Sequence, residues 1–294
     1  MSQIYLLPEF QASDSAKPVN VASVPQLRPF RYPGGKTWLV PIVRRWLGAC
    51  SRRPKIMVEP FAGGGIISLT AAFEKLADRI EMVEIDEQVA SVWETILSDD
   101  ADWLADKILN FQLSVASAKA ELAKSPTTVR DLAFQTILKN RTAHGGILAE
   151  GAGVIKHGEN GKGILSRWYP QTISRRIRCI HSISNRLNFR RGDAFDAINR
   201  HRNAPCAVFF IDPPYTAGGK SAGSRLYNHS EIDHEHLFSL CEEIKGGFLM
   251  TYDNAEEVQT LAARHGFAVR PIPMKNTHHA EMTELLVSKD LAWF

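Results

Sequence analysis

Apolar residues along the 294-residue chain fall into short runs separated by stretches with helical spacing. Short apolar runs bounded by turn-forming residues are typical of buried strands, whereas apolar residues three and four positions apart are typical of helices. The runs predict strands at 55–59, 80–85, 187–191, 206–211, 247–252, 267–272 and 283–287. Helical spacing marks 38–47, 66–76, 99–124, 129–139, 233–245 and 255–265.

The alternation of strands and helices predicts an α/β fold with a doubly wound, mostly parallel sheet. The short link between the last two strands predicts an antiparallel pair that closes this sheet. The stretch 99–186 lacks strand signals, so we interpret it as an inserted, mostly helical domain, with loops or a hairpin over its glycine-rich part, 140–178. The catalytic domain then comprises 28–98 and 187–294, and the aperiodic residues 1–27 are predicted to form a flexible tail.

One tetrapeptide, Asp212-Pro213-Pro214-Tyr215, directly follows the apolar strand 206–211. In open α/β sheets, ligands bind beyond the carboxyl ends of the strands. The Asp212 carboxylate and the Pro213 carbonyl can each accept an N–H from an exocyclic amine of an aromatic base. The Tyr215 ring can stack on that base. Because proline fixes φ, both acceptors are held in place before the substrate arrives. We therefore predict a catalytic turn that activates an amine, followed by a glycine-rich lid that includes Tyr227.

A second motif, Pro60-Phe61-Ala62-Gly63-Gly64-Gly65, connects the strand 55–59 to a helix, and Glu84 ends the next strand. Such a βαβ unit lets the backbone approach a nucleotide while an acid binds ribose hydroxyls. The third glycine of the dinucleotide fingerprint is missing, because Ser68 stands there, which disfavours a nicotinamide cofactor. Gly35-Lys36-Thr37 is not a P-loop, because Phe30 replaces the required glycine.

Charge is unevenly distributed although the net charge is only +3. Residues 139–191 carry 11 Lys and Arg against two Glu, whereas the rest of the chain carries 24 basic and 30 acidic residues. Phosphate contacts need clustered cations, so this basic segment is typical of a polyanion-binding surface. The four cysteines and the histidines lack ligand spacing, and we expect no metal, no membrane-spanning segment, a cytoplasmic location and a monomer.

Taken together, the motifs resemble the DNA adenine methylase (Dam) family, the D12 class of adenine-specific DNA methyltransferases. The matching elements, which occur in that family's order, are 31–36, 58–65, 84–86, 212–215 and 284–286. The resemblance implies a Rossmann-like methyltransferase fold, transfer of a methyl group from S-adenosylmethionine to N6 of a flipped-out adenine, and double-stranded DNA as the partner. A functional pairing with a restriction endonuclease is left open.

Site residues follow from the same resemblance. We expect the cofactor to contact Tyr32, Lys36, Glu59, Phe61, Gly63, Gly65, Glu84, Asp193, Phe195 and Asp212. Asp193 has a second interpretation as the N-cap of a helix. We expect DNA to contact Arg141, His144, Arg167, Tyr169, Arg175, Arg176 and Tyr227. After Asn140-Arg141 this chain departs from the family, with 142–146 reading Thr-Ala-His-Gly-Gly, which affects the recognised sequence rather than the chemistry.

Several alternatives remain open at the level of sequence. The same chemistry suits N4 of cytosine, an RNA base or a protein glutamine amide, because the turn specifies an amine and not the molecule that carries it. From other classes, the chain could be a nucleotide-binding oxidoreductase, or a DNA-binding protein with a vestigial turn.

Overall fold

The computed structural model of the chain describes residues 24–32, 34–148, 155, 158, 161–214, 232–275 and 281–294. One seven-stranded sheet forms its centre, with the strand order β3-β2-β1-β4-β5-β7-β6. The strands are β1 (Ile56–Glu59), β2 (Arg79–Glu84), β3 (Leu187–Arg191), β4 (Ala207–Ile211), β5 (Gly247–Asp253), β6 (Ala268–Lys275) and β7 (Glu281–Ser288). β7 pairs antiparallel with both β5 and β6, and all other pairs are parallel. This confirms the predicted α/β sheet with its antiparallel closing pair.

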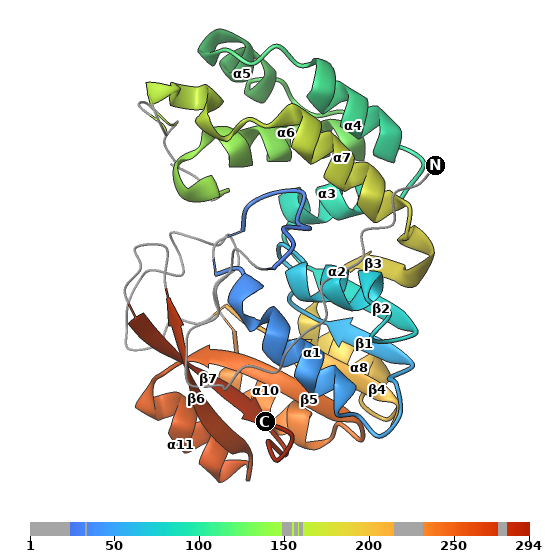
Figure 1. Ribbon diagram of the computed structural model, residues 1–294, viewed down its shortest axis with the longest axis vertical. Helices are drawn as coiled ribbons and strands as arrows, with labels where there is room; N and C mark the ends of the chain where they lie inside the picture. The colour runs from blue at the N-terminus through green and yellow to red at the C-terminus, as the bar shows by residue number, and fades with distance from the viewer. Residues whose placement is uncertain are drawn as a thin grey trace.

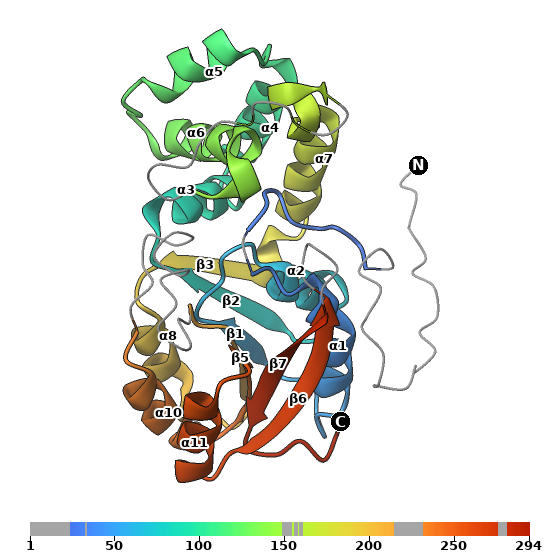
Figure 2. The ribbon, with the colours of Figure 1, turned by 90° about the vertical axis from the view of Figure 1, so that its left-hand side faces the viewer.

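Helices cover both faces of the sheet (Figures 1 and 2). One face packs against α1 (Val40–Gly48), α2 (Ile66–Phe73) and α3 (Glu87–Ile96), and the other against α8 (Ala194–His201), α10 (His234–Glu242) and α11 (Glu256–Arg264). The central strand β4 shows why: Val208 and Phe210 join the first core, whereas Phe209 and Ile211 join the second. A strand that is apolar at every position needs cover on both sides.

The remaining helices lie together at one end of the molecule, beyond β3 (Figure 1). They are α4 (Ala101–Asn110), α5 (Val115–Leu122), α6 (Val129–Thr142) and α7 (Pro170–His181). α6 packs against α3 and α4 against α7, so the helices contact each other and α3. Short 3-10 turns occur at 37–39, 144–146, 163–167 and 184–186. Among the described residues, no helix is both long and apolar enough to span a bilayer.

Two sequence predictions for this helical part were wrong in detail. The single helix expected over 99–124 is two helices, because Ser114 starts α5 with a capping box: its side chain accepts from the Ser117 N–H, and the Ser117 hydroxyl accepts from the Ser114 N–H. The loops or hairpin expected up to residue 178 end earlier, because Pro170 begins α7 and the helix buries Ile173 and Ile177. The helix α3, which the apolar pattern did not single out, begins at its N-cap, Asp86.

Candidate active site at the carboxyl ends of the strands

The site lies where the strand order reverses. From β1 the chain builds outward to β2 and β3, then returns to place β4 on the other side of β1. Ligands of open α/β sheets bind at such a switch point, beyond the carboxyl ends of the strands. Three predicted site residues meet there: Glu59 ends β1, Glu84 ends β2, and Asp212 follows β4. The sheet thus brings together carboxylates that are far apart in the sequence.

Asp212 is held by two residues from other elements. Lys36 Nζ lies 3.1 Å from Asp212 Oδ1, and the Thr251 hydroxyl donates to the same oxygen at 2.8 Å. The other side-chain oxygen, Oδ2, has no hydrogen-bond partner among the described residues. One oxygen therefore fixes the carboxylate while the second can accept a hydrogen bond from a ligand.

Lys36 also contacts a residue from the opposite end of the sequence. Its Nζ lies 3.2 Å from Glu284 Oε2, on β7, and both side chains are buried. Burial raises the pKa of Glu284 to about 7, with Lys36 opposing the shift and Asp212 adding to it. Lys36 therefore links the predicted catalytic turn to the antiparallel strand that closes the sheet.

Sequence reasoning did not assign Thr251 or Glu284 a role in the site. Thr251 lies in β5, at the same edge as Asp212, because β5 runs parallel to β4. Its position near the end of a predicted strand beside the catalytic strand was a usable signal. Glu284 was quoted only as part of a motif, since the short link predicts an antiparallel pair but does not show that β7 lies beside β5, which brings the Glu284 side chain to Lys36.

The glycine turn between β1 and α2 has the conformation that its sequence predicts. Gly63 and Gly65 have φ of +46° and +62°, a backbone conformation that residues with a Cβ rarely adopt. The Trp93 indole N–H donates to the Gly63 carbonyl at 2.9 Å, which holds the turn from α3. A Cβ on Gly63 would lie 2.6 Å from the Tyr32 ring. Tyr32 therefore packs directly over the turn, and its contact with a cofactor stays a prediction.

Glu84 holds this turn, and Glu59 holds the start of the helix α2 that follows it. Glu84 accepts from the Gly63 N–H at 2.9 Å and from the Asp86 N–H at 3.0 Å, and Glu59 accepts from the Ser68 N–H at 3.0 Å. Burial raises the pKa of Glu84 to about 7 and that of Glu59 to about 8, and neighbouring carboxylates add to both shifts. A carboxylate has about four acceptor positions, so Glu84 keeps capacity for ligand hydroxyls.

The loop after β3 confirms one interpretation of Asp193, the helix N-cap, and contact with a cofactor stays a prediction. The Asp193 carboxylate accepts from the N–H groups of Phe195 and Asp196, which makes it the N-cap of α8. The residue is nevertheless exposed and lies beside Glu84, whose carbonyl accepts from the Gly192 N–H. Phe195 is half-buried, with its ring 5.0 Å from that of His236. An exposed acid and a ring thus flank the site next to Glu84.

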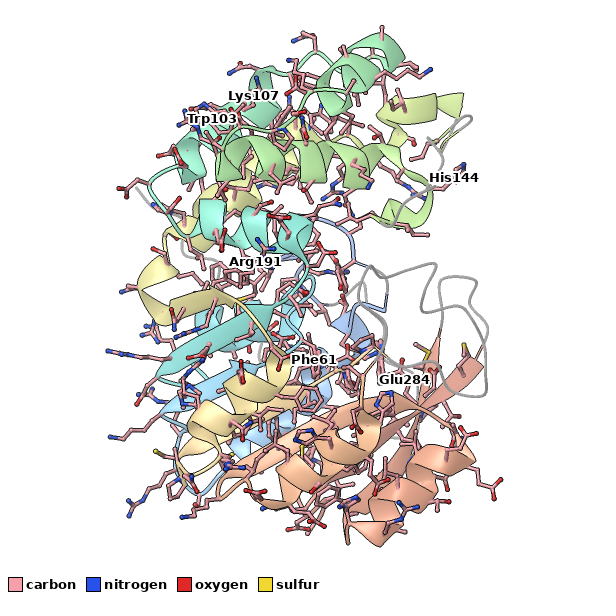
Figure 3. All side chains as sticks on the ribbon, turned by 180° about the vertical axis from the view of Figure 1, so that it is seen from behind. Phe61, Trp103, Lys107, His144, Arg191 and Glu284 are labelled. Carbon is pink, nitrogen blue, oxygen red and sulfur yellow. The ribbon has the colours of Figure 1, made fainter. Side chains whose placement is uncertain are left out.

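The remaining members of the predicted catalytic turn are described only in part. Pro213 is buried and Pro214 half-buried, directly after Asp212. Tyr215 and the lid residue Tyr227 lie outside the described residues. Phe61 and Glu284, labelled in Figure 3, lie in the part of the molecule that holds the sheet, whereas His144 lies in the helical part.

The residues expected to contact DNA differ widely in exposure. His144, Tyr169 and Arg175 are exposed, and Arg167 and Arg176 are half-buried. Arg141 is buried, and its guanidinium donates to the Pro29 carbonyl at 2.9 Å, because α6 continues through residue 142 and turns this side chain toward the segment 28–32. Contact with nucleic acid stays a prediction for all of them.

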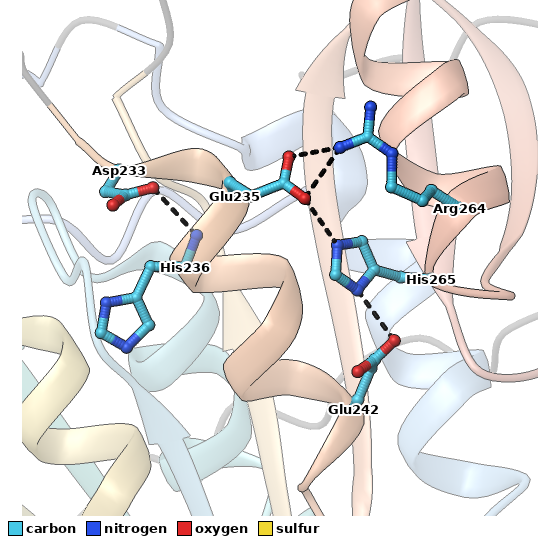
Figure 4. Close-up of polar contacts among 6 residues, drawn as sticks. All are labelled: Asp233, Glu235, His236, Glu242, Arg264 and His265. Carbon is cyan, nitrogen blue, oxygen red and sulfur yellow. Dashed lines mark hydrogen bonds and ion pairs between the residues drawn. The ribbon is translucent and has the colours of Figure 1, made fainter.

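Histidines elsewhere take part in surface networks. The His236 N–H donates to the Asp233 carboxylate, and His265 lies between Glu242 and Glu235, which also binds Arg264 (Figure 4). The His236 contact caps α10, and the contacts of His265 and Arg264 join α10 to the end of α11. Among the described residues, no group of His, Cys, Asp and Glu could hold a metal ion.

Comparisons with known proteins found similarity only among solved structures. No family model and no curated protein matches the chain. An rRNA methyltransferase, aviRa from Streptomyces viridochromogenes, shares 15% identity over 88% of this chain and 87% of its own, with a TM-score of 0.39. A precorrin-6y C5,15-methyltransferase from Geobacter metallireducens shares 9% identity over 84% of both chains, with a TM-score of 0.38.

A third solved structure, TrmN from Thermus thermophilus, shares 14% identity over 86% of this chain and 48% of its own, with a TM-score of 0.36. At such identities and TM-scores, these similarities do not determine what the chain acts on. The arrangement of Asp212, Lys36 and Thr251 beside the glycine turn is the better guide to function.

Proposed function

We propose that this protein is an S-adenosylmethionine-dependent methyltransferase that acts on the exocyclic amine of a nucleobase, with N6 of adenine in DNA as the leading target. One observation carries the proposal: a carboxylate-proline-proline turn stands at the switch point of the sheet, with one Asp212 oxygen anchored by Lys36 and Thr251 and the other available among the described residues. The glycine turn lies at the same edge.

The residues around the glycine turn fit such a cofactor. The positive φ values of Gly63 and Gly65 give a close backbone approach, and Tyr32 packs over the turn. The buried Glu84 has acceptor capacity for ribose hydroxyls, and the exposed Asp193 can accept from an adenine amine. S-adenosylmethionine supplies an electrophilic methyl group on a sulfonium.

The chain's own contribution to the reaction is positioning and hydrogen bonding. Asp212 Oδ2 and the Pro213 carbonyl each accept one N–H of the target amine, which draws the nitrogen toward tetrahedral geometry and frees its lone pair. A bond then forms between the nitrogen and the methyl carbon, the carbon–sulfur bond breaks, and the nitrogen gives up one proton. Asp212 stands beside this nitrogen as an acceptor for that proton. Acceptors aimed at the charge that develops are a large source of rate enhancement.

Adenine in DNA leads because of the ordered set of motifs that resemble the Dam family and the basic segment 139–191. The same turn would serve N4 of cytosine or an amine of an RNA base, since both carry the same group on a phosphodiester backbone. A nicotinamide cofactor is less well supported, because Ser68 occupies the third glycine position and is fully buried. Calorimetry with S-adenosylmethionine against NAD separates these two cofactors.

The test is identification of the methylated product. The purified chain is incubated with S-adenosylmethionine and unmethylated DNA or RNA, and the product is digested to nucleosides for mass spectrometry. We expect N6-methyldeoxyadenosine from DNA. N4-methylcytidine derivatives or a product from RNA only would replace the leading target, and no product with any nucleic acid would contradict the proposal.

Substitution of the turn tests the mechanism. Asp212→Ala is expected to lower transfer by at least about 100-fold, the typical effect of removing a group that stabilises developing charge, with cofactor binding retained. Asp78→Ala, which changes a carboxylate in an exposed pair with Arg53, serves as the control and should leave transfer unchanged. Undiminished transfer by Asp212→Ala would rule out this assignment.

A further inference from the structure

Four arginines converge where the helical part meets the glycine turn. Arg28 and Arg31 belong to the segment that precedes Lys36, Arg141 comes from α6, and Arg176 comes from α7. The Arg176 guanidinium donates to the Arg28 carbonyl at 3.2 Å, and Arg141 donates to the carbonyl of the next residue, Pro29. We call these four residues the arginine cluster.

The arginine cluster borders the cofactor side of the site. The Arg28 side chain fills the space beside Gly64 and Gly35: a Cβ on Gly64 would lie 3.1 Å from Arg28 Cδ, and one on Gly35 would overlap the guanidinium. The same Gly64 position lies 3.0 Å from Tyr32 Cβ. Arg28 is therefore the neighbour of the ring that packs over the glycine turn.

Among the residues that the structure describes, no carboxylate pairs with Arg28, Arg141 or Arg176. Burial lowers the pKa of Arg28 to about 10, and the charged groups that lower it further are Arg31 and Arg176. Burial also lowers the pKa of Arg141 to about 10, and Arg176, Arg31 and Arg28 all add to that shift, whereas Tyr169 opposes it. Arg141 Nε is buried and has no hydrogen-bond partner among the described residues.

Another arginine of α7, in contrast, is paired with carboxylates. Arg178, two positions after Arg176, donates to Asp102 at 3.0 Å and to Asp106 at 2.7 Å. Within the described part of the chain, two carboxylates thus pair with an exposed arginine on this helix, whereas none pairs with the half-buried Arg176. Placing the partly buried guanidinium groups of Arg28, Arg141 and Arg176 near one another costs free energy, and an anionic ligand would offset that cost.

We propose that the arginine cluster binds one backbone phosphate of the nucleic acid that carries the target base. This inference rests on the proposed function for the identity of the polyanion. Guanidinium groups match phosphate oxygens in bidentate geometry. Solvent reaches three members of the cluster, because Arg31 is exposed and Arg28 and Arg176 are half-buried, whereas Arg141 is buried. A phosphate held there fixes the strand next to Tyr32 and the Asp212 turn.

The first test uses inorganic phosphate as the probe and needs neither cofactor nor nucleic acid. A ligand that binds the folded state raises the melting temperature, so phosphate should stabilise the wild type more than chloride at equal ionic strength. Arg28→Gln and Arg176→Gln should lose this gain, while Arg178→Gln should keep it. Both cluster variants should also be at least as stable as the wild type in chloride, because repulsion is relieved. An equal phosphate gain in Arg176→Gln and the wild type would overturn the proposal.

The second test uses the nucleic acid. Each phosphate contact contributes about 0.9 to the slope of log affinity against log salt, so Arg176→Gln should lower the slope by about one and weaken binding to all sequences equally. Arg176→Lys keeps the charge and should retain most of the slope, and Arg178→Gln should match the wild type. An unchanged slope in Arg176→Gln overturns the proposal.

A measurement of cofactor binding distinguishes two anions that the arginine cluster could bind, a nucleic-acid phosphate and the carboxylate of S-adenosylmethionine. Arg28→Gln and Arg176→Gln should bind S-adenosylmethionine as tightly as the wild type in calorimetry without nucleic acid. Weaker cofactor binding by both would mean that the arginine cluster holds the cofactor's carboxylate, which overturns the phosphate assignment. Failure of the proposed function would give a different result. The wild type would show no methyl transfer, whereas the stabilisation by phosphate and the salt dependence of nucleic-acid binding could still be measured, because neither requires methyl transfer.

Discussion

At the scale of single residues, the buried carboxylates make stability depend on pH. Glu59 has a pKa of about 8 in the folded protein, raised by burial from a value near 4.5. Between these two pH values the folded state binds more protons than the unfolded state, so the free energy of unfolding falls as pH rises. Glu84 and Glu284, each with a pKa of about 7, act in the same direction.

Glu59→Gln should therefore flatten this dependence. The slope of the free energy of unfolding between pH 5 and 8 is expected to become shallower by up to about 1.4 kcal/mol per pH unit, because Gln still accepts from Ser68 but does not titrate. Urea unfolding at four pH values measures it. Asp131→Asn is the control, since the Thr128 hydroxyl lowers the pKa of that exposed carboxyl and its titration lies below this range. A slope as steep as that of the wild type would contradict the burial of an ionisable Glu59.

Thr251 tests whether Asp212 needs an anchor. Thr251→Val keeps the shape of a fully buried side chain but removes the hydroxyl that donates to Asp212 Oδ1. We expect kcat to fall by about 10- to 100-fold with little change in KM, because a misplaced group costs rate rather than binding. Thr251→Ser should restore the rate. Steady-state kinetics measure both, and a full rate for Thr251→Val would leave Lys36 as the sufficient anchor.

At the scale of elements, the glycine turn carries the most specific constraint. Gly63→Ala places a Cβ at φ +46° and against the Tyr32 ring, so we expect a loss of about 1–3 kcal/mol in stability and weaker cofactor binding. Gly48→Ala is a matched control, because Gly48 is the last residue of α1 and a Cβ there meets nothing within 4 Å. Chemical denaturation and calorimetry distinguish the two, and equal behaviour would show that Tyr32 does not pack over the turn.

The sequence predicted an element correctly where a few consecutive residues determine its structure. The all-apolar run of β4 and the glycines before α2 each encode their structure within a few residues, so the strands and the turn were confirmed. The break at Ser114 was missed because a capping box can interrupt an unbroken apolar pattern. The contacts of Lys36 with Glu284 and of Asp212 with Thr251 were missed because they depend on which strands are neighbours in the sheet, and strand directions alone do not fix that order.

At the scale of the whole molecule, Asn140 joins the helical part to the segment 28–32. Its side chain accepts from the Arg31 N–H at 2.9 Å and donates to the carbonyls of Arg31 at 2.7 Å and Gly146 at 2.6 Å. Asn140→Ala should cost about 2–4 kcal/mol, since three hydrogen bonds are lost in a buried place. Cofactor affinity should fall as well, because Tyr32 follows Arg31 directly.

The control for this variant is Asn110→Ala, which removes an exposed hydrogen bond at the end of α4 and should have little effect. Urea denaturation and calorimetry measure both variants. An Asn140→Ala protein that is destabilised but binds the cofactor normally would show that the helical part does not hold Tyr32 in place.

The pairing of Lys36 with Glu284 has a consequence for how the site forms. The two residues come from opposite ends of the sequence, and Thr251 and Asp212 also lie far from Lys36 along the chain. Closing such long loops is slow compared with forming local helices. Helices such as α5 and α6 can therefore form early, whereas Asp212 gains its contacts with Lys36 and Thr251 late, and Lys36 gains Glu284 only once β7 has docked. A partly folded chain would carry the motifs in full and still lack the assembled site.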